Sequence, residues 1–145
     1  MLSSLLLSHL LVLGASQAVA GEVVSGSHTK GSIFMFGDAT ACRNIFWRNG
    51  ACGLSTYFSN SVDRSLPLVA MPSGIFEPYG QAQNNRLCGK VITMTHKGVT
   101  RKAVVADQNT SSEQSIDMCL DTWQAFGGHD NDGTLRKGIQ WSIAI

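Results

Sequence analysis

Charged residues are scarce in this chain of 145 residues: Asp, Glu, Lys and Arg make up 14%, and the formal net charge is +1. The sequence has no basic stripe, and binding to nucleic acid or to an anionic membrane surface depends on clustered Lys and Arg. After residue 20, no stretch approaches the roughly 20 apolar residues needed to cross a bilayer. We therefore expect neither nucleic acid nor a membrane among the partners.

The first twenty residues differ from the rest. Leu5 to Leu13 is almost entirely apolar, and Ala18-Val19-Ala20 has the small-x-small pattern that a signal peptidase reads. A membrane anchor is the alternative, but the run is too short for a bilayer of ~30 Å. The segment predicts a signal peptide over residues 1–20, cleavage after Ala20 and a secreted, extracellular protein. N-terminal sequencing checks this, and secreted material beginning at Met1 would contradict it.

All four cysteines follow that segment, at positions separated by 10, 36 and 31 residues: Cys42, Cys52, Cys88 and Cys119. An even number in a secreted chain favours two disulfides, for which three pairings are possible. Zinc is the alternative, but its sites usually contain CxxC-type spacing. We expect disulfides, no metal and no cofactor, in a monomer.

The remaining chain predicts a polar, flexible N-terminal arm over residues 21–32 and one domain over residues 33–145. Within the domain, the pattern predicts a strand at 33–36, a loop at 43–50, a short apolar run at 66–70 and at most one helical turn at 71–80. Two β-rich runs, 91–95 and 99–105, predict a hairpin. Leu120, Trp123 and Phe126 predict a helix over 116–126, and the alternation in 138–145 predicts a terminal strand.

Six short motifs occur in a fixed order along the domain. They are Gly37-Asp38-Ala39-Thr40, Gly50-Ala51-Cys52-Gly53, Cys88-Gly89-Lys90, Val104-Val105-Ala106-Asp107, Ile116-Asp117-Met118 and Gly138-Ile139-Gln140-Trp141. Together they resemble the double-psi β-barrel of expansins, barwin-like proteins and rare-lipoprotein-A-like domains, and most closely the loosenins. The resemblance implies a mainly β fold: a six-stranded double-psi β-barrel with one helix near the C-terminus and one or two short helical turns.

In the expansin pattern, a shallow groove for polysaccharide carries a Thr and two Asp residues, and these roles fall on Thr40, Asp107 and Asp117. Each Asp also has a structural interpretation. Asp117 lies at the start of the predicted helix and would cap it, which is worth about 0.5–2 kcal/mol. Asp107 ends a predicted strand and would form a turn. For Asp117, capping and a groove role are compatible with each other.

Two departures from the loosenin pattern concern the groove. The Arg-Cys that usually follows the middle Asp is replaced by Gln108-Asn109, and the usual aromatic pair after the Thr is replaced by Ala41-Cys42. Candidates for the missing sugar-stacking surface are Trp47, Tyr57 and Tyr79, each of which is equally compatible with packing. Asn109-Thr110-Ser111 is the only N-glycosylation sequon, so Asn109 either carries a glycan beside Asp107 or is an unused sequon.

The same resemblance implies the disulfide pairing. In expansin-like barrels the cysteine of the GACG motif commonly bonds the cysteine that opens the middle hairpin. This gives Cys52–Cys88, and with it Cys42–Cys119.

Three functions are compatible with this interpretation. The first is non-hydrolytic binding and loosening of a cell-wall polysaccharide, cellulose or chitin. The second is an interaction protein, an effector or cysteine-protease inhibitor with an extracellular protein partner. The third is a weak glycan hydrolase or lytic transglycosylase. Hydrolysis usually needs two carboxylates flanking the bond. The family-45 glycoside hydrolases place their base just after the first strand, where this chain has Ala41-Cys42-Arg43. We therefore favour a protein that is not an enzyme.

Overall fold

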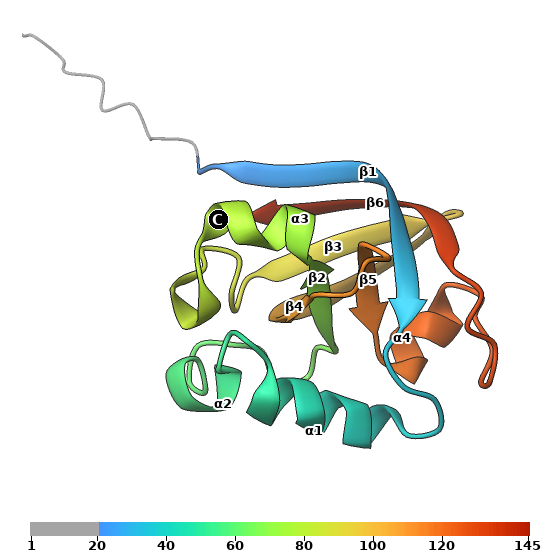
Figure 1. Cartoon of the computed structure of the whole chain (residues 1–145), viewed down its shortest axis with the longest axis horizontal. Helices are drawn as coiled ribbons and strands as arrows, with labels where there is room; N and C mark the ends of the chain where they lie inside the picture. The colour runs from blue at the N-terminus through green and yellow to red at the C-terminus, as the bar shows by residue number, and fades with distance from the viewer. Residues whose placement is uncertain (1–20) are drawn as a thin grey trace, which may run out of the picture.

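Six β-strands pair edge to edge and close into a barrel in the order β1-β5-β2-β4-β3-β6 (Figure 1). This computed structural model describes residues 21–145, so the predicted signal peptide lies outside the described residues. In chain order the elements are β1 (Val23–Ile33), α1 (Ala39–Asn49), α2 (Leu54–Tyr57), β2 (Leu68–Pro72), α3 (Ser73–Phe76), η1 (Glu77–Tyr79), η2 (Ala82–Asn84), β3 (Val91–His96), β4 (Val99–Asn109), β5 (Ser115–Met118), α4 (Leu120–Ala125) and β6 (Arg136–Ala144).

Two strand pairs, β1–β5 and β2–β4, are parallel, and the other four pairs are antiparallel. The mainly β fold with a closed six-stranded barrel and short helices is therefore confirmed, as are the 91–105 hairpin and the C-terminal strand. Segment 71–80 forms α3 followed by η1, which is more helix than the single predicted turn. No helix within residues 21–145 is long and apolar enough to cross a bilayer.

The predicted flexible arm at 21–32 is wrong, because β1 occupies Val23–Ile33 and pairs with both β6 and β5. The barrel domain therefore begins at residue 23 and not at residue 33. Two glycines that suggested a loose segment make room for large side chains. A Cβ on Gly26 would lie 2.6 Å from Trp141 Nε1, and one on Gly31 would lie 2.5 Å from Ile139 Cδ1. Glycine here serves close packing between strands.

The predicted strand at 33–36 and loop at 43–50 are also wrong: β1 ends at Ile33, and helix α1 spans most of the supposed loop. The Asp38 carboxylate caps the helix by accepting hydrogen bonds from the N–H groups of Thr40 (2.9 Å) and Ala41 (3.0 Å). Cys42 and Phe46, four residues apart, form its buried face. The Asp38 cap and the four-residue spacing of Cys42 and Phe46 were the sequence signals that could have predicted this helix. The polar residues between Cys42 and Phe46 obscured its helical period.

The predicted helix at 116–126 begins later, at Leu120, because Ser115–Met118 forms strand β5 between β1 and β2. Ile116 and Met118 are both fully buried, and Asp117 between them is half-buried on the other face. This is the two-residue alternation of a strand. Asp117 is therefore not a helix cap.

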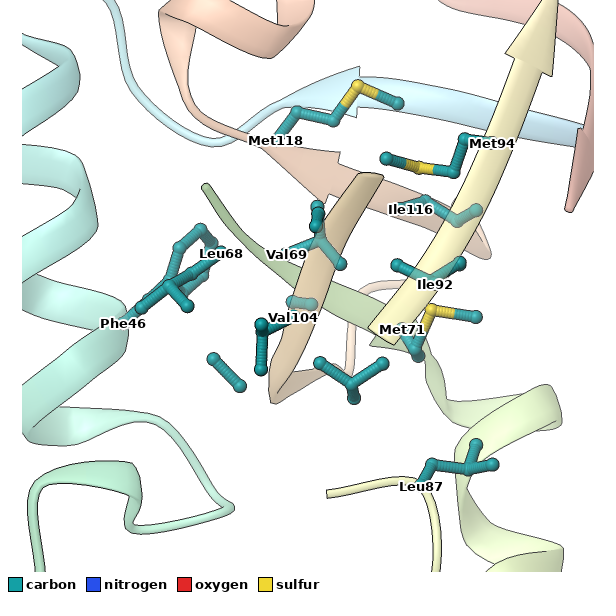
Figure 2. Packing of buried hydrophobic residues seen from close by; sticks show 14 of the residues in the cluster. Phe46, Leu68, Val69, Met71, Leu87, Ile92, Met94, Val104, Ile116 and Met118 are labelled. Atoms are coloured by element: carbon teal, nitrogen blue, oxygen red, sulfur yellow. The ribbon is translucent and has the colours of Figure 1, made fainter. Parts of the chain in front are cut away.

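The core fills the barrel and the space between the barrel and α1 (Figure 2). Figure 2 shows Ile92 and Met94 of β3 directed toward Ile116 and Met118 of β5, and Phe46 directed from α1 toward β2. Burying each such side chain stabilises the fold by about 1.5–3 kcal/mol.

Both predicted disulfides are present. Cys42–Cys119 joins α1 to the residue that follows β5, and Cys52–Cys88 joins the segment after α1 to the segment before β3.

Candidate functional site

Asp107 and Asp117, here called the carboxylate pair, lie on either side of Ala70 in β2. Ala70 is the register partner of Asp107 in β4 and of Asp117 in β5. Neighbouring strands are about 4.8 Å apart, so the two Cα atoms lie roughly 10 Å apart with their side chains on the same face. A bulge produces this register, because Val69 pairs with Val105 but Ala70 pairs with Asp107. Bulges commonly redirect a side chain next to a functional site.

Asp107 lies within β4 and does not form the turn that was the alternative interpretation. Its Oδ1 accepts hydrogen bonds from the N–H groups of Ala51 (2.7 Å) and Gln108 (2.8 Å). The first bond places the carboxylate beneath the end of α1, where Cys52 N–H also donates to the Ala106 carbonyl at 3.1 Å. Burial raises the pKa of Asp107, and the two N–H groups partly oppose that rise.

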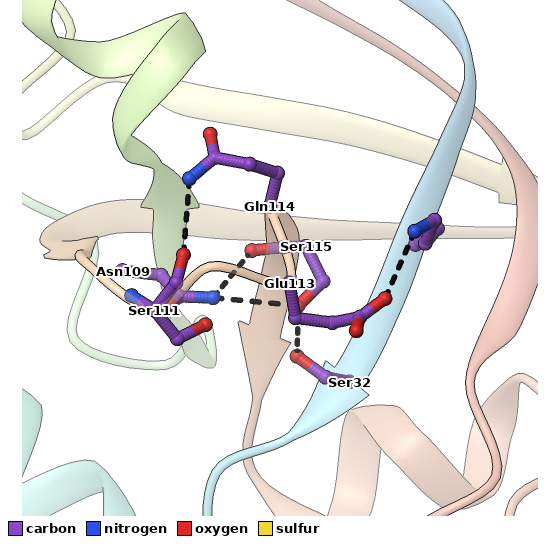
Figure 3. Close-up of polar contacts among 7 residues, drawn as sticks. Ser32, Asn109, Ser111, Glu113, Gln114 and Ser115 are labelled. Atoms are coloured by element: carbon purple, nitrogen blue, oxygen red, sulfur yellow. Dashed lines mark hydrogen bonds and ion pairs between the residues drawn. The ribbon is translucent and has the colours of Figure 1, made fainter.

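Asp117 is held by a chain of polar groups that sequence analysis missed. Ser32 Oγ of β1 donates to Asp117 Oδ1, and the Ser32 and Ser115 hydroxyls lie 2.6 Å apart. Asn109 Nδ2 donates to the carbonyl (2.9 Å) and the hydroxyl (3.3 Å) of Ser115 (Figure 3). The parallel register of Ser32 with Asp117 brings these groups together.

The pKa of Asp117 is also raised, first by burial and then by the charge of Asp107, while the Ser32 hydrogen bond lowers it. Asp107 therefore lies close enough for the two charges to interact, and ionising both carboxylates is unfavourable in the folded state. Residues that oppose stability in this way are typical of functional sites.

The raised pKa of Asp117 makes the stability of the protein depend on pH. A folded-state pKa above the ordinary value of 3.8 means that the native protein binds more protons than the unfolded chain in that interval. The contribution of Asp117 to stability is complete below pH 3.8 and is lost as the pH rises through the folded-state pKa. We expect Asp117→Asn to be more stable than wild type at pH 7, and the difference to shrink toward pH 3.

Urea unfolding of both proteins across this pH range measures the difference directly. Groups such as His96, whose pKa is lowered chiefly by burial, titrate in both proteins and cancel from the comparison. A difference that does not change with pH would contradict the expectation.

The other predicted groove residues come from α1, α2 and η1. Thr40 is exposed in the first turn of α1. Trp47 lies against the guanidinium groups of Arg43 and Arg64, 5.7 and 4.8 Å from its ring centroid. Tyr57 is 61% exposed on α2. Tyr79 is half-buried at the end of η1 and lines a hollow together with residues that include Trp141. Within residues 21–145, no hydrogen bond joins any of these four to the carboxylate pair.

Asn109, the first residue of the sequon, is buried beside the network that holds Asp117. Its side chain is 7% exposed, and the amide nitrogen that would carry the sugar donates to Ser115. Its Oδ1 accepts from Ser111 N–H at 3.0 Å. A glycan on this nitrogen would replace one of the two hydrogens with which Nδ2 bonds Ser115.

Comparison with known proteins identifies the fold. No family model matches the sequence, and no curated protein matches it significantly. Among solved structures, the chain is similar to the Streptomyces papain inhibitor, with a TM-score of 0.53 and 21% identity over 84% of this chain and 96% of that one. It is also similar to a Clavibacter michiganensis expansin, as a point mutant in complex with cellohexaose (TM-score 0.55, 20% identity) and without ligand (TM-score 0.53, 21% identity).

The expansin matches cover 84% of this chain but 51% of the expansin, so the chain spans about half the length of that protein. These likenesses, together with the closed barrel, show the expansin-like double-psi fold that the ordered motifs predicted.

Proposed function

We propose that the protein is secreted, binds a neutral cell-wall polysaccharide on the face that carries the carboxylate pair, and loosens it without hydrolysis. The observation that carries this proposal is the position of Asp107 and Asp117 on either side of Ala70. Within residues 21–145, each has one oxygen, Oδ2, that accepts no hydrogen bond. A sugar hydroxyl is a donor, and its bond to a carboxylate is stronger than one between neutral groups.

The proposal that binding occurs without cleavage rests on the sequence after the first predicted strand. The family-45 glycoside hydrolases place their base there, where this chain has Ala41-Cys42-Arg43. Hydrolysis usually requires two carboxylates in the roles of acid and base or nucleophile. In this proposal, Asp107 and Asp117 instead serve as two hydrogen-bonding anchors for the polysaccharide. The expansin complex with cellohexaose supports the same ligand class on this fold.

A second candidate is a protease inhibitor. The observation in its favour is that this chain covers 96% of the Streptomyces papain inhibitor, which matches as a barrel of similar extent. Such a protein would bind a protease and would not need the carboxylate pair.

The test is retention on insoluble cellulose and chitin, with released reducing sugar and papain inhibition measured in parallel. We expect Asp107→Asn and Asp117→Asn each to weaken polysaccharide binding roughly tenfold or more, because a hydrogen bond to a charged group contributes about 1.5–3 kcal/mol. Asn preserves the acceptor for Ala51 and Ser32 but removes the charge.

The matched control is Asp121→Asn. Asp121 is exposed on α4, and its carboxylate accepts only the N–H of Thr122 (2.9 Å) within the described chain. This variant should bind like wild type. Equal loss in all three variants would overturn the proposed site. Sugar release would make the protein a hydrolase, and papain inhibition without polysaccharide binding would favour the inhibitor.

A further inference from the structure

A second polar site lies on the opposite side of the barrel from the carboxylate pair. Strand β6 lies three positions from β2 in the six-strand order. Where β6 begins, it borders the turn between β3 and β4 and a hollow of about 400 Å³. This hollow, here called the basic hollow, is lined by His96, Lys97, Thr134, Leu135, Arg136 and Lys137.

Two buried nitrogen atoms of the basic hollow have no hydrogen-bond partner among residues 21–145: His96 Nδ1 and Arg136 Nε. His96 is only 4% exposed, and such groups in folded proteins almost always have a partner. The one other unpartnered buried side-chain nitrogen in that range is Trp123 Nε1. It belongs to the ring over which Arg136 Cζ lies, 5.1 Å from the ring centroid. All three unpartnered groups therefore occur in one corner of the molecule.

The neighbouring contacts hold Arg136 without satisfying its Nε. The nearest carboxylate is Asp132, whose Oδ2 lies 3.9 Å from Nη2, while its Oδ1 accepts from Thr134 N–H (3.0 Å) and Thr134 Oγ1 (2.7 Å). The guanidinium carbon of Arg136 also lies over the Trp123 ring, a cation–π contact. A guanidinium whose Nε–H lacks a partner is suited to a planar or tetrahedral oxyanion, since its donors form a rigid fork.

Positive charge gathers around these two groups. Lys97 lies in the β3–β4 turn and Lys137 on β6, and both are exposed and line the basic hollow. Burial is the largest cause that lowers the pKa of His96, and the charges of Lys97 and Arg136 lower it further. A hydrogen bond with the backbone of Gly138 raises it. A net charge of +1 excludes a basic stripe along the chain, but it does not exclude a local site for one anion.

We propose that the basic hollow binds an oxyanion, with Arg136 Nε–H and protonated His96 as donors and with Lys97 and Lys137 supplying charge. The chemistry is shared by inorganic sulfate and by the sulfate or carboxylate groups of an acidic glycan. This site is independent of the carboxylate pair, and its ligand class is the opposite of the neutral polysaccharide proposed there.

The experiment uses the mature chain and sulfate as the probe, with chloride at equal ionic strength as the reference. By linkage, a bound anion stabilises the protonated imidazole, so sulfate should raise the pKa of His96 in an NMR titration. His28, exposed on β1, is the internal control and should not respond. Affinity electrophoresis in polygalacturonate and in dextran sulfate tests the polymer-borne groups.

Two variants separate charge from geometry. Lys97→Gln/Lys137→Gln removes two exposed charges without touching the core, and we expect about tenfold weaker binding. The matched control, Arg48→Gln/Lys90→Gln, makes the same charge change at exposed positions outside the basic hollow and should bind like wild type. Arg136→Lys keeps the charge but loses the fork, and we also expect about tenfold weaker binding.

Loss of sulfate binding in the basic-hollow variants supports the proposal for a free anion, and loss of only polymer binding supports it for an acidic glycan. Absence of both from wild type would overturn it. Equal weakening in the control variant would also overturn it, because binding would then follow net charge alone.

Discussion

Gly50→Ala is expected to destabilise the protein by about 3 kcal/mol, at the upper end of the usual effect of overpacking. A Cβ at this position would lie 2.4 Å from the carbonyl oxygen of Ala106 and 2.6 Å from that of Phe46. Both atoms belong to the backbone and have no rotamer by which to move away. The backbone of Gly50 has φ −65° and ψ 152°, which any residue adopts, so glycine is required here for space and not for conformation.

We expect Gly50→Ala to disturb the carboxylate pair as well. Gly50 separates α1 from Ala51, whose N–H donates to Asp107, and Ala106 directly precedes Asp107 in β4. Moving the two segments apart lengthens that hydrogen bond. Thermal unfolding measures the stability, and retention on cellulose measures the site.

Gly133→Ala is the matched control, because its Cβ would meet only Phe36 Cζ at an ordinary 3.9 Å. We expect this variant to unfold like wild type. If the two alanine variants had the same stability, the close approach of α1 to β4 would not constrain the fold.

Removing the Cys42–Cys119 disulfide as Cys42→Ala/Cys119→Ala should lower the free energy of unfolding by about 4 kcal/mol. The bond joins residues 77 apart in sequence, and on the chain-entropy model a loop of that length corresponds to about this value. Both cysteines are buried, so the substitution also removes packing between α1 and the start of α4. Urea unfolding of the two proteins gives the difference.

The comparison variant is Cys52→Ala/Cys88→Ala, whose bond joins residues 36 apart. The entropy model predicts a slightly smaller loss for the shorter loop, by less than about 1 kcal/mol. A loss below about 1 kcal/mol for Cys42→Ala/Cys119→Ala would mean that the buried face of α1 alone holds the helix in place.

Sequence analysis predicted the parts of the fold that have strong local patterns. The hairpin contains two β-rich runs around Lys97-Gly98, and the last strand alternates Ile139, Trp141 and Ile143. Asp107 and Asp117 were proposed as groove residues from the resemblance of their motifs to the expansin pattern. The structure then brought them together through a strand that lies between them, which no local pattern describes.

Two of the errors, at β1 and at Ser32, have a common physical cause: the missing information lay in pairing between segments far apart in the sequence. The polar Gly/Ser-rich segment 21–31 becomes a strand because β5 and β6 provide its partners, and its glycines accommodate Trp141 and Ile139. Ser32 could not be assigned to the site because its contact with Asp117 depends on a parallel register between segments far apart in sequence. Helix α1 was missed although Asp38, Cys42 and Phe46 contained its signal.

The pairing of β1 with β6 also determines when the barrel can form. The first and last strands of the described chain share one seam, and Ile145 N–H donates to the Glu22 carbonyl at 2.9 Å beyond its end. Loop closure over such distances is slow, and barrels of this kind fold in roughly milliseconds to seconds. During synthesis, β1 and β3 each lack one neighbouring strand until β6 has been made, because β6 pairs with both. Until β6 has emerged, the nascent chain keeps two open sheet edges, which is the state most exposed to aggregation and most in need of a chaperone.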